Sequence, residues 1–324
     1  MKFRQLLITL CLTSILSFGF SNSGWAGGQA YITNQGSDNV SVIDLDNNRV
    51  TAVINVGKAP VGVAVSAKLG RVFVSNLKTP SISVIDSKSQ KVIDEIPVKG
   101  SPVALVLSPD STTLYVADWF EGRVVAINTR NYDGQRQAQV GESPAGMAVS
   151  PDNKRLYIAN RDTDNVTVLD TANLQILARV PVGRHPYGLT LNGTGTELYV
   201  VNVKANNVSV VDTRTYTSVA TIKVGEHPYC VTTSSDGKQL YVTNTQSDNV
   251  SVIDIGQRKV VTIIPVGTYP EGINYDKTKQ RIYVASWADD MVSVIDATTN
   301  KVISSIPTGK QSRAFGEFIL DAVN

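Results

Sequence analysis

The chain has 324 residues, of which 42% are hydrophobic and 18% charged, a composition that supports a large packed core and excludes a disordered chain. Its 2 Cys and 2 His are too few for a disulfide scaffold, a zinc-finger protein or an iron–sulfur protein. The net charge of +2, with no basic block, argues against nucleic-acid binding as the default function.

The N-terminal residues have the pattern of an export signal. Lys2 and Arg4 precede an apolar run at 6–20, and Gly24 and Ala26 suit the small-residue positions of a cleavage site. The alternative is a membrane anchor, but the run is shorter than the ~20 residues that a spanning helix needs. We therefore predict a secretory signal peptide at residues 1–26 and a periplasmic or secreted mature protein.

Cleavage after residue 26 changes the charge and thiol content of the chain. The mature protein loses two of its 30 cationic residues and none of its 28 acidic residues, so its formal net charge is zero. Its only thiol is that of Cys230, so no internal disulfide can form. An exported protein without disulfides suits a periplasm-like compartment, provided that its fold is stable on its own.

The remaining chain is one unit repeated at an interval of 42 residues. A proline recurs six times, an aromatic residue followed by Val or Ile recurs seven times, and an Asp (once Asn) recurs seven times. The three columns are Pro60, Pro102, Pro144, Pro186, Pro228 and Pro270; Tyr31, Phe73, Tyr115, Tyr157, Tyr199, Tyr241 and Tyr283; and Asp44, Asp86, Asn128, Asp170, Asp212, Asp254 and Asp296.

Each unit contains four segments typical of short β-strands. The first follows the proline, as at 186–191, the second holds the aromatic residue, as at 240–244, and the third alternates strictly, as at 249–254; a fourth follows at 259–266. Four strands in ~40 residues is the pattern of a propeller blade. We predict an all-β fold, a seven-bladed β-propeller of four-stranded antiparallel blades, as a single domain over residues 27–324.

The ends of the repeat array predict how the ring closes. Residues 30–56 supply strands two to four of a blade, and residues 312–320 have the pattern of its missing first strand. Pairing of these two pieces would remove the open sheet edges. The glycine at position 57 and its repeat equivalents are interpreted as a tight-turn requirement, and the Asp44 column as the cap of the turn after strand three.

Several segments resemble the YVTN-type β-propeller repeat family. The resemblance rests on Tyr-Val-Thr-Asn at 241–244, Tyr-Ile-Thr-Asn at 31–34 and Asp-Asn-Val-Ser-Val-Ile-Asp at 38–44 and 248–254, and it extends over nearly all of the mature chain. It implies an exported or surface-located propeller, often with seven blades. It does not imply one function, because related propellers include single-stranded DNA binders, metal chaperones, lactonases, a lyase, haem-binding domains and haem-free subunits of periplasmic oxidoreductases.

The positions around the repeated proline indicate where a site would lie. The first strand is innermost in a propeller, so these positions surround one mouth of the central channel. The first three repeats carry small residues there, whereas the last four carry chemically diverse ones. The candidate ligand- or partner-binding residues are His185, Tyr187, His227, Tyr229, Cys230, Tyr269, Glu271 and Arg313, joined on the same face by Trp119 and Trp287 of the loops between strands two and three.

The histidines and the tryptophans each leave alternative interpretations open. His185 and His227, with Cys230 nearby, are a candidate soft-metal or haem ligand set, although the chain lacks a Cys-x-x-Cys-His motif; the competing interpretation is duplicated repeat sequence. Trp119 and Trp287 form either an interface or a packing contact with their own blades. No cofactor is predicted as the main expectation.

The uniform repeat length favours a non-catalytic binding or scaffold protein, because enzymes usually place chemistry on elaborated loops. A specific version is a cofactor-free subunit of a periplasmic redox complex, with a protein partner or small ligand on the loop face and no stable membrane insertion. The alternatives are a lyase or lactonase using His185, His227 and Glu271, a metal or haem carrier, and a single-stranded nucleic-acid binder, which the neutral mature chain disfavours.

Overall fold

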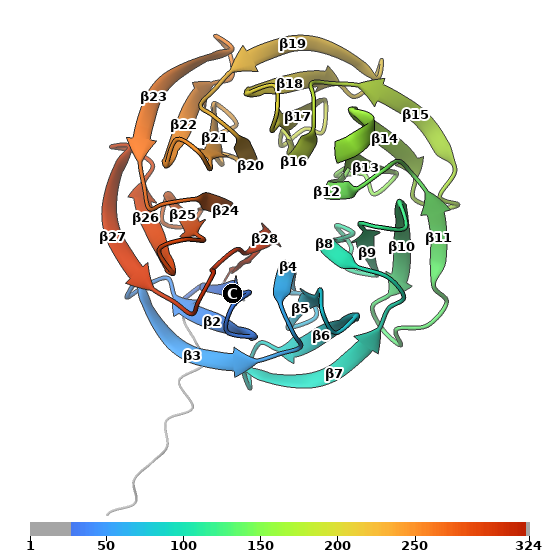
Figure 1. Cartoon of the computed structure of the whole chain (residues 1–324), viewed down its shortest axis with the longest axis vertical. Coiled ribbons are helices and arrows are strands. Elements are labelled where there is room, and N and C mark those ends of the chain that lie inside the picture. The colour runs from blue at the N-terminus through green and yellow to red at the C-terminus, as the bar shows by residue number, and fades with distance from the viewer. Residues whose placement is uncertain (1–26, 322–324) are drawn as a thin grey trace, which may run out of the picture.

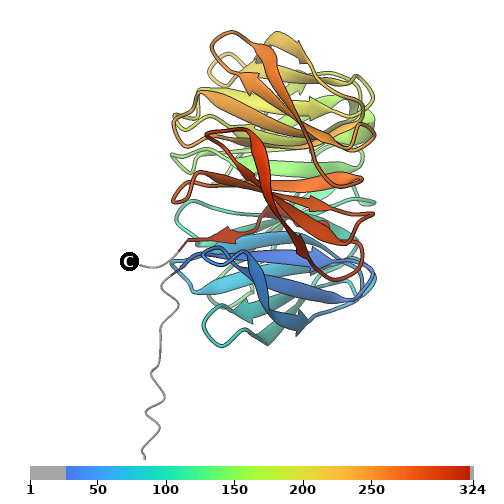
Figure 2. The ribbon, with the colours of Figure 1, turned by 90° about the vertical axis from the view of Figure 1, so that its left-hand side faces the viewer.

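The computed structural model describes residues 27–321 as an all-β, seven-bladed β-propeller (Figure 1). The predicted signal peptide at 1–26 lies outside the described residues. Among residues 27–321, no helix is long and apolar enough to cross a membrane. Figure 2 shows the ring from the side, with both ends of the described chain leaving the same face.

Each blade is a four-stranded antiparallel sheet, and we number the blades from the first proline-led strand. Blade 1 has β4 (Pro60–Ser66), β5 (Arg71–Asn76), β6 (Ser81–Asp86) and β7 (Lys91–Pro97); blade 2 has β8 (Pro102–Leu107), β9 (Thr113–Asp118), β10 (Arg123–Asn128) and β11 (Arg136–Gln139); blade 3 has β12 (Pro144–Val149), β13 (Arg155–Asn160), the 3-10 helix η1 (Arg161–Thr163), β14 (Asn165–Asp170) and β15 (Ile176–Pro181).

The remaining blades follow the same order. Blade 4 has β16 (Pro186–Leu191), β17 (Glu197–Asn202), β18 (Asn207–Asp212) and β19 (Thr217–Lys223); blade 5 has β20 (Pro228–Thr233), β21 (Gln239–Asn244), β22 (Asn249–Asp254) and β23 (Lys259–Pro265); blade 6 has β24 (Pro270–Asp276), β25 (Arg281–Ser286), β26 (Met291–Asp296) and β27 (Lys301–Pro307); blade 7 has β29 (Ile319–Leu320), β1 (Gln29–Asn34), β2 (Asn39–Asp44) and β3 (Arg49–Asn55).

The core lies between adjacent blades, and the repeated aromatic residue is its largest component. The second strand of each blade is buried on both faces, whereas the fourth, outermost strand is largely exposed. The side chains of the aromatic column are 0–2% exposed, so each fills the space between two sheets. This burial explains why the column has no gap.

The turn after strand three is capped as the sequence predicts. The carboxylate of Asp44 accepts hydrogen bonds from the backbone N–H groups of Asp46 and Asn47, at 2.7 and 3.2 Å. Asp296 makes the same bonds to Thr298 and Thr299 in blade 6. The pKa of both carboxyls is lowered: burial opposes this shift at Asp44 but is outweighed by the hydrogen bonds from Asn47 and Asp46, and at Asp296 the Thr298 hydroxyl contributes most.

The repeated glycine has a different cause from the one expected. A β-carbon on Gly183 would lie 2.7 Å from the side chain of Asn202, and one on Gly225 would lie 2.7 Å from Asn244. The glycine is therefore required by close approach to the buried Asn that ends strand two of the next blade, and the tight-turn interpretation was wrong. The left-handed backbone conformation instead falls on the residue before the proline, as at Ala59.

The buried Asn also ties strands two and three together. Asn202 is 0% exposed and donates from Nδ2 to Asn207 Oδ1 at 2.7 Å and to Ser209 Oγ at 2.9 Å. Blade 2 departs from this arrangement with two linked changes. Asp118 replaces the Asn and Arg123 replaces its Asn partner, and the two form an ion pair of 2.9 Å in which the carboxylate is buried and the guanidinium partly exposed.

Ring closure is confirmed, and the closing segment takes an irregular path. In blade 4, Leu191 lies opposite Leu198. The repeat interval makes Glu317 the counterpart of Leu191 and Ala30 that of Leu198, yet Ala30 lies opposite Ile319. The closing segment therefore holds two more residues than a regular first strand.

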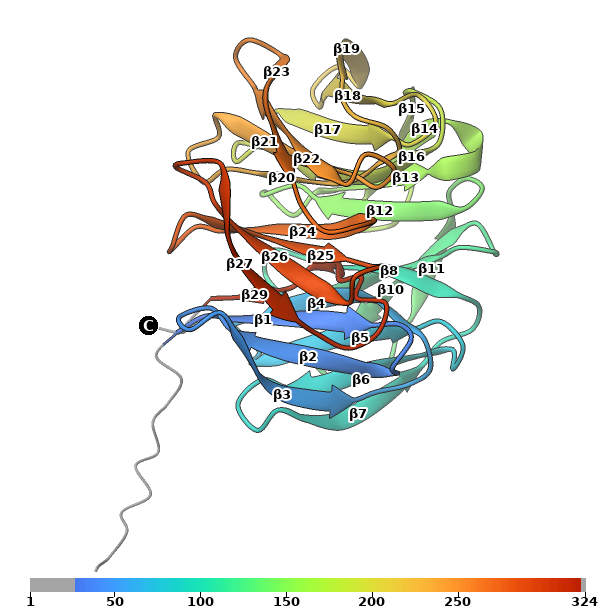
Figure 3. The ribbon, with the colours of Figure 1, turned by 60° about the vertical axis from the view of Figure 1, so that its left-hand side comes forward.

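The extra residues leave the blade and enter the channel. Ser312 keeps the regular position, bridging Asn34. The chain then leaves blade 7 as β28 (Phe315–Glu317), which pairs in parallel with β4 of blade 1, before β29 returns to β1 (Figure 3). Gly316 permits this path, because its φ is +123° and a β-carbon there would lie 2.3 Å from the carbonyl oxygen of Val63.

We predict that the Asp118–Arg123 pair is a replaceable structural unit. Arg123→Asn would leave Asp118 buried without its cation and lower the free energy of unfolding by about 3–5 kcal/mol. The double variant Asp118→Asn/Arg123→Asn restores the pair found in blade 4 and should lie within about 1 kcal/mol of the wild type. Chemical denaturation of both variants and of Asp118→Asn measures the coupling; additive single effects would contradict the prediction.

We also predict that the closing segment holds the ring together. Deletion of residues 312–324 should lower Tm by at least 10 °C, because it removes the fully buried Phe318 side chain and exposes the edge of β1. A synthetic peptide of residues 312–324 added in trans should restore most of the loss. An unchanged Tm after deletion would contradict the prediction.

Candidate functional site

Seven residues, one from each blade, surround the channel at the mouth where the proline-led strands begin. Blades 1 to 3 contribute small apolar side chains, whereas blades 4 to 7 contribute larger polar ones. The seven are Val61, Val103, Ala145, Tyr187, Tyr229, Glu271 and Arg313. The structure thus brings four of the predicted site residues together on one side of the mouth.

Two tyrosines and a phenylalanine fill the middle of the channel. The rings of Tyr187 and Tyr229 lie 4.2 Å apart, and the Tyr229 hydroxyl donates to the Tyr187 hydroxyl at 2.8 Å. The ring of Phe315, from β28, lies 5.0 Å from Tyr187 and 6.2 Å from Tyr229. Burial raises the pKa of Tyr187 to about 12, so the pair is uncharged at neutral pH.

Arg313 connects this aromatic cluster to an ion pair. Its Nε lies 2.5 Å from a carboxylate oxygen of Glu271, and one terminal nitrogen donates to the Tyr229 hydroxyl at 2.6 Å. The other terminal nitrogen donates to Gln35 at 3.4 Å. Burial raises the pKa of the Glu271 carboxyl and the Arg313 guanidinium opposes that shift, whereas Glu271 raises the pKa of Arg313.

A small hollow lies beside this network on the loop face. Its volume is about 180 Å³, and the small residues of blades 1 and 2 leave the space that the tyrosines occupy elsewhere. The lining residues are Val61, Leu77, Val103, Trp119, Phe120, Tyr187 and Arg313. The hollow is therefore an apolar and aromatic pocket with one guanidinium at its edge.

The two tryptophans behave differently from each other. Trp119 leans over the mouth, with its ring 6.0 Å from Tyr187, two blades away, and the Arg161 guanidinium 5.9 Å above it. Phe120 beside it is 79% exposed. Trp287 stays near its own blade and packs 6.3 Å from the 42%-exposed ring of Tyr269. Trp119 therefore lines the hollow directly, whereas Trp287 reaches the site through Gln35, to which its indole N–H donates at 3.5 Å.

Both histidines occupy a strained turn position. His185 and His227 have φ of +53° and +56°, and their backbone N–H groups donate to Asp164 and Asn206 at 2.8 and 2.9 Å. The Ser143 turn of another blade has the same conformation. This geometry favours the interpretation that the two histidines are duplicated turn residues. Their backbone conformation, rather than the imidazole ring, would then stabilise the turn.

The ring of His227 is bonded to a loop residue rather than to Cys230. His227 Nδ1 lies 3.0 Å from Thr245 Oγ1, and burial, with nearby Lys204 and Arg161, lowers its pKa. Cys230 lies beyond the aromatic cluster, where it lines a second hollow, and burial raises its thiol pKa. Within residues 27–321, no group of three His, Cys, Asp or Glu could hold a metal ion. A metal or haem site at His185 and His227 therefore stays a prediction, and Cys230 does not lie with His227.

Three site residues escaped the sequence analysis. Phe120 follows Trp119 at an expected loop tip but was not among the predicted site residues, and Gln35 lies in the equivalent loop of blade 7, where a Gln alone does not indicate a channel contact. Phe315 lies in the closing segment, which was expected to form a regular strand. Its place in the channel depends on the two extra residues, and a 42-residue register cannot reveal them.

Two family models match parts of the chain. One, described as a YNCE-like beta-propeller, matches residues 190–280, and another, described as a lactonase, 7-bladed beta-propeller, matches residues 126–232. The PE-PGRS family protein PE_PGRS18 of Mycobacterium tuberculosis is 57% identical over 44 residues, which are 14% of this chain and 10% of that protein. The chain thus spans about a tenth of the length of this curated relative.

Solved structures share the fold at low sequence identity. A chain of Kuenenia stuttgartiensis hydrazine synthase superposes with a TM-score of 0.74 at 21% identity, covering 84% of this chain and 93% of that one. A functionally unknown protein from Desulfotomaculum acetoxidans gives 0.78 at 15%, covering 89% and 99%. The dihydro-heme d1 dehydrogenase NirN gives 0.67 at 13%, covering 90% and 75%. These likenesses establish the propeller architecture alone.

We predict that the histidine rings contribute little to stability, whereas their backbone conformation matters. His185→Asn should leave the free energy of unfolding within about 0.5 kcal/mol, because Asn tolerates the left-handed region. His185→Val should cost about 1–2 kcal/mol, because its branched β-carbon does not. Denaturant titration compares the two variants; equal losses would show that the ring itself is the stabilising group.

Proposed function

We propose that the protein is an exported, non-catalytic propeller that binds a partner protein at the loop-face mouth of its channel. The supporting observation is the 180 Å³ hollow between Trp119, Phe120 and Tyr187, with Arg313 at its edge. Small-molecule sites usually have ~300–1,000 Å³, so this hollow suits a single inserted side chain better than a whole substrate.

The surface around the hollow has the character of an interface. Phe120 is 79% exposed and Tyr269 is 42% exposed on the same face, and exposed aromatic residues are enriched where proteins bind one another. One terminal nitrogen of Arg313 donates one of its two N–H groups to Gln35. A carbonyl or carboxylate oxygen of the partner would accept a hydrogen bond from the other N–H group of that nitrogen. The inserted group is thus an apolar side chain next to an acceptor oxygen.

The bonding of the candidate acid–base groups supports binding over catalysis. Glu271 is engaged by Arg313, and His227 Nδ1 by Thr245. A general base must reach the proton that it removes. These groups would have to give up their present partners before acting as the lyase or lactonase residues considered above.

The specific form of the proposal is a cofactor-free subunit of a periplasmic redox complex. The signal-like residues 1–26 support export. The fold likeness to a chain of hydrazine synthase supports a place in such an assembly by analogy alone. The YVTN-type resemblance is consistent with this role, because haem-free subunits occur among related propellers.

We predict that the protein purifies from its native host in a complex that depends on the aromatic mouth. Phe120→Ser and Trp119→Ala should each weaken the complex at least tenfold, because they remove the walls of the hollow. The matched control is Val53→Ser, which removes a 59%-exposed apolar side chain from the outer strand β3. Size-exclusion chromatography with light scattering, followed by mass spectrometry, measures complex size and composition.

Two results would overturn the proposal. One is a strictly monomeric protein in extracts of its native host. The other is hydrolysis of a panel of lactones by the purified protein, abolished in His185→Asn/His227→Asn while the fold is retained.

A further inference from the structure

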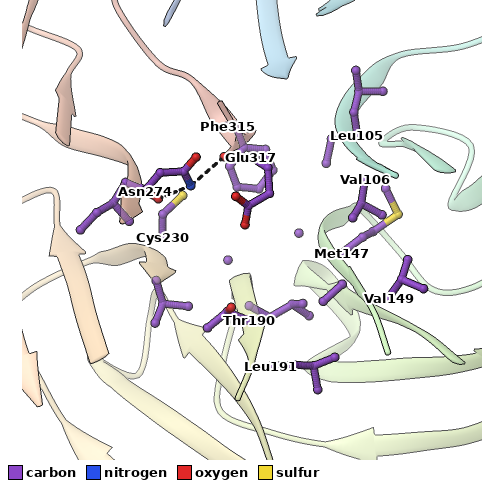
Figure 4. Close-up of a pocket in the computed structure, with 18 of the residues that line it drawn as sticks. Leu105, Val106, Met147, Val149, Thr190, Leu191, Cys230, Asn274, Phe315 and Glu317 are labelled. Carbon is purple, nitrogen blue, oxygen red and sulfur yellow. Dashed lines mark hydrogen bonds between the residues drawn. The ribbon is translucent and has the colours of Figure 1, made fainter. Parts of the chain in front are cut away.

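A second hollow lies on the far side of the aromatic cluster, facing the turns between strands one and two. Its volume is about 310 Å³, within the range of small-molecule sites. The walls are mainly aliphatic, from the inner strands of blades 2 to 6 (Figure 4). They include Leu105, Leu107, Met147, Val149, Leu189 and Leu191.

One carboxylate enters this hollow. Figure 4 shows Glu317 projecting into the lumen from the closing segment. Among the residues that line the hollow, only Glu317 and Cys230 are ionisable. The hollow therefore contains a source of negative charge and no cationic side chain.

Glu317 has no counterion in contact. No hydrogen bond or ion pair of its side chain occurs within residues 27–321, and the nearby Lys277 is itself paired with Asp321 at 2.8 Å. Enclosure by the channel walls and then Asp321 raise the carboxyl pKa, and Lys277 opposes the shift, although the side chain itself is exposed to the lumen. The side chain remains accessible from the lumen, so a ligand can reach it.

The carboxylate is placed there by a departure from the repeat. At the equivalent position the other blades have Val65, Leu107, Val149, Leu191, Thr233 and Tyr275. The two extra residues described above carry Phe315–Glu317 out of blade 7 and into the channel. Asn274 fixes this path by accepting from the backbone N–H of Phe318 at 2.6 Å and donating to the carbonyl of Gly316 at 3.2 Å.

We propose that this hollow binds a small organic cation, an ammonium group on an apolar body, with Glu317 as the counterion. The aliphatic walls would contact the apolar body, and the lone carboxylate would select the charge. A bare metal ion fits less well, because hard cations need several oxygen ligands and the described residues supply no cluster of acids here.

The test uses 2-phenylethylammonium as the probe and 2-phenylethanol as its neutral counterpart, with isothermal titration calorimetry at pH 7.5. The wild-type protein should bind the cation at least tenfold tighter than the alcohol. Glu317→Gln, which keeps the shape, should bring the two affinities within twofold. Val53→Ser, on the outer strand β3, should keep the wild-type preference.

Three results would overturn the proposal: equal affinity of the wild type for both probes, binding of neither probe, or a preference for the cation that survives in Glu317→Gln. Thermal melting of each variant confirms that the ring is intact. Probe binding is independent of partner binding at the loop face, so the outcomes of the two experiments are separable.

Discussion

The contact on which the ring most depends is that between a buried Asn and a glycine of the preceding interblade loop. The amide of Asn202 lies so close to Gly183 that a β-carbon on Gly183 would clash with it. The same amide donates its N–H groups to the side chains of Asn207 and Ser209 in strand three of its own blade. Each such contact fixes one blade against the loop that leads into it. The contact recurs in five of the seven blades, and Asp118 and Ser286 take the Asn position in blades 2 and 6. Because blades in a repeat array touch only their neighbours, this short-range constraint sets much of the ring geometry.

This constraint explains why so much of the fold is readable from the sequence. The spacing of 42 residues, the aromatic column and the turn-capping Asp each reflect a local contact that recurs in every blade. The reason for the glycine column was not readable, because close approach and a left-handed turn both select glycine. At His185 the reverse holds: the backbone is left-handed, yet the residue is not glycine, so this conformation could not be read from the sequence.

The candidate site was only partly predictable for the same physical reason. Comparison of columns located Tyr187, Tyr229, Glu271 and Arg313 on one side of the mouth, because each stands at a regular position. The equivalent positions show which side chains lie on the same face of the ring, but not which of them are in contact. His227 directly precedes β20 and Cys230 lies within it, yet their side chains lie on different sides of the aromatic cluster.

The most consequential feature of the channel arises where the repeat fails. A regular closing strand would place Glu317 within blade 7, and the channel would hold only what each blade's first strand supplies. Two extra residues instead place Phe315 against the tyrosines and Glu317 in the lumen beyond them. Each of the other segments must keep its strand register so that the next blade is placed correctly. The closing segment only completes blade 7, so two extra residues in it displace no other blade. The closing segment is thus the place where this fold can gain a new side chain in the channel without moving any blade.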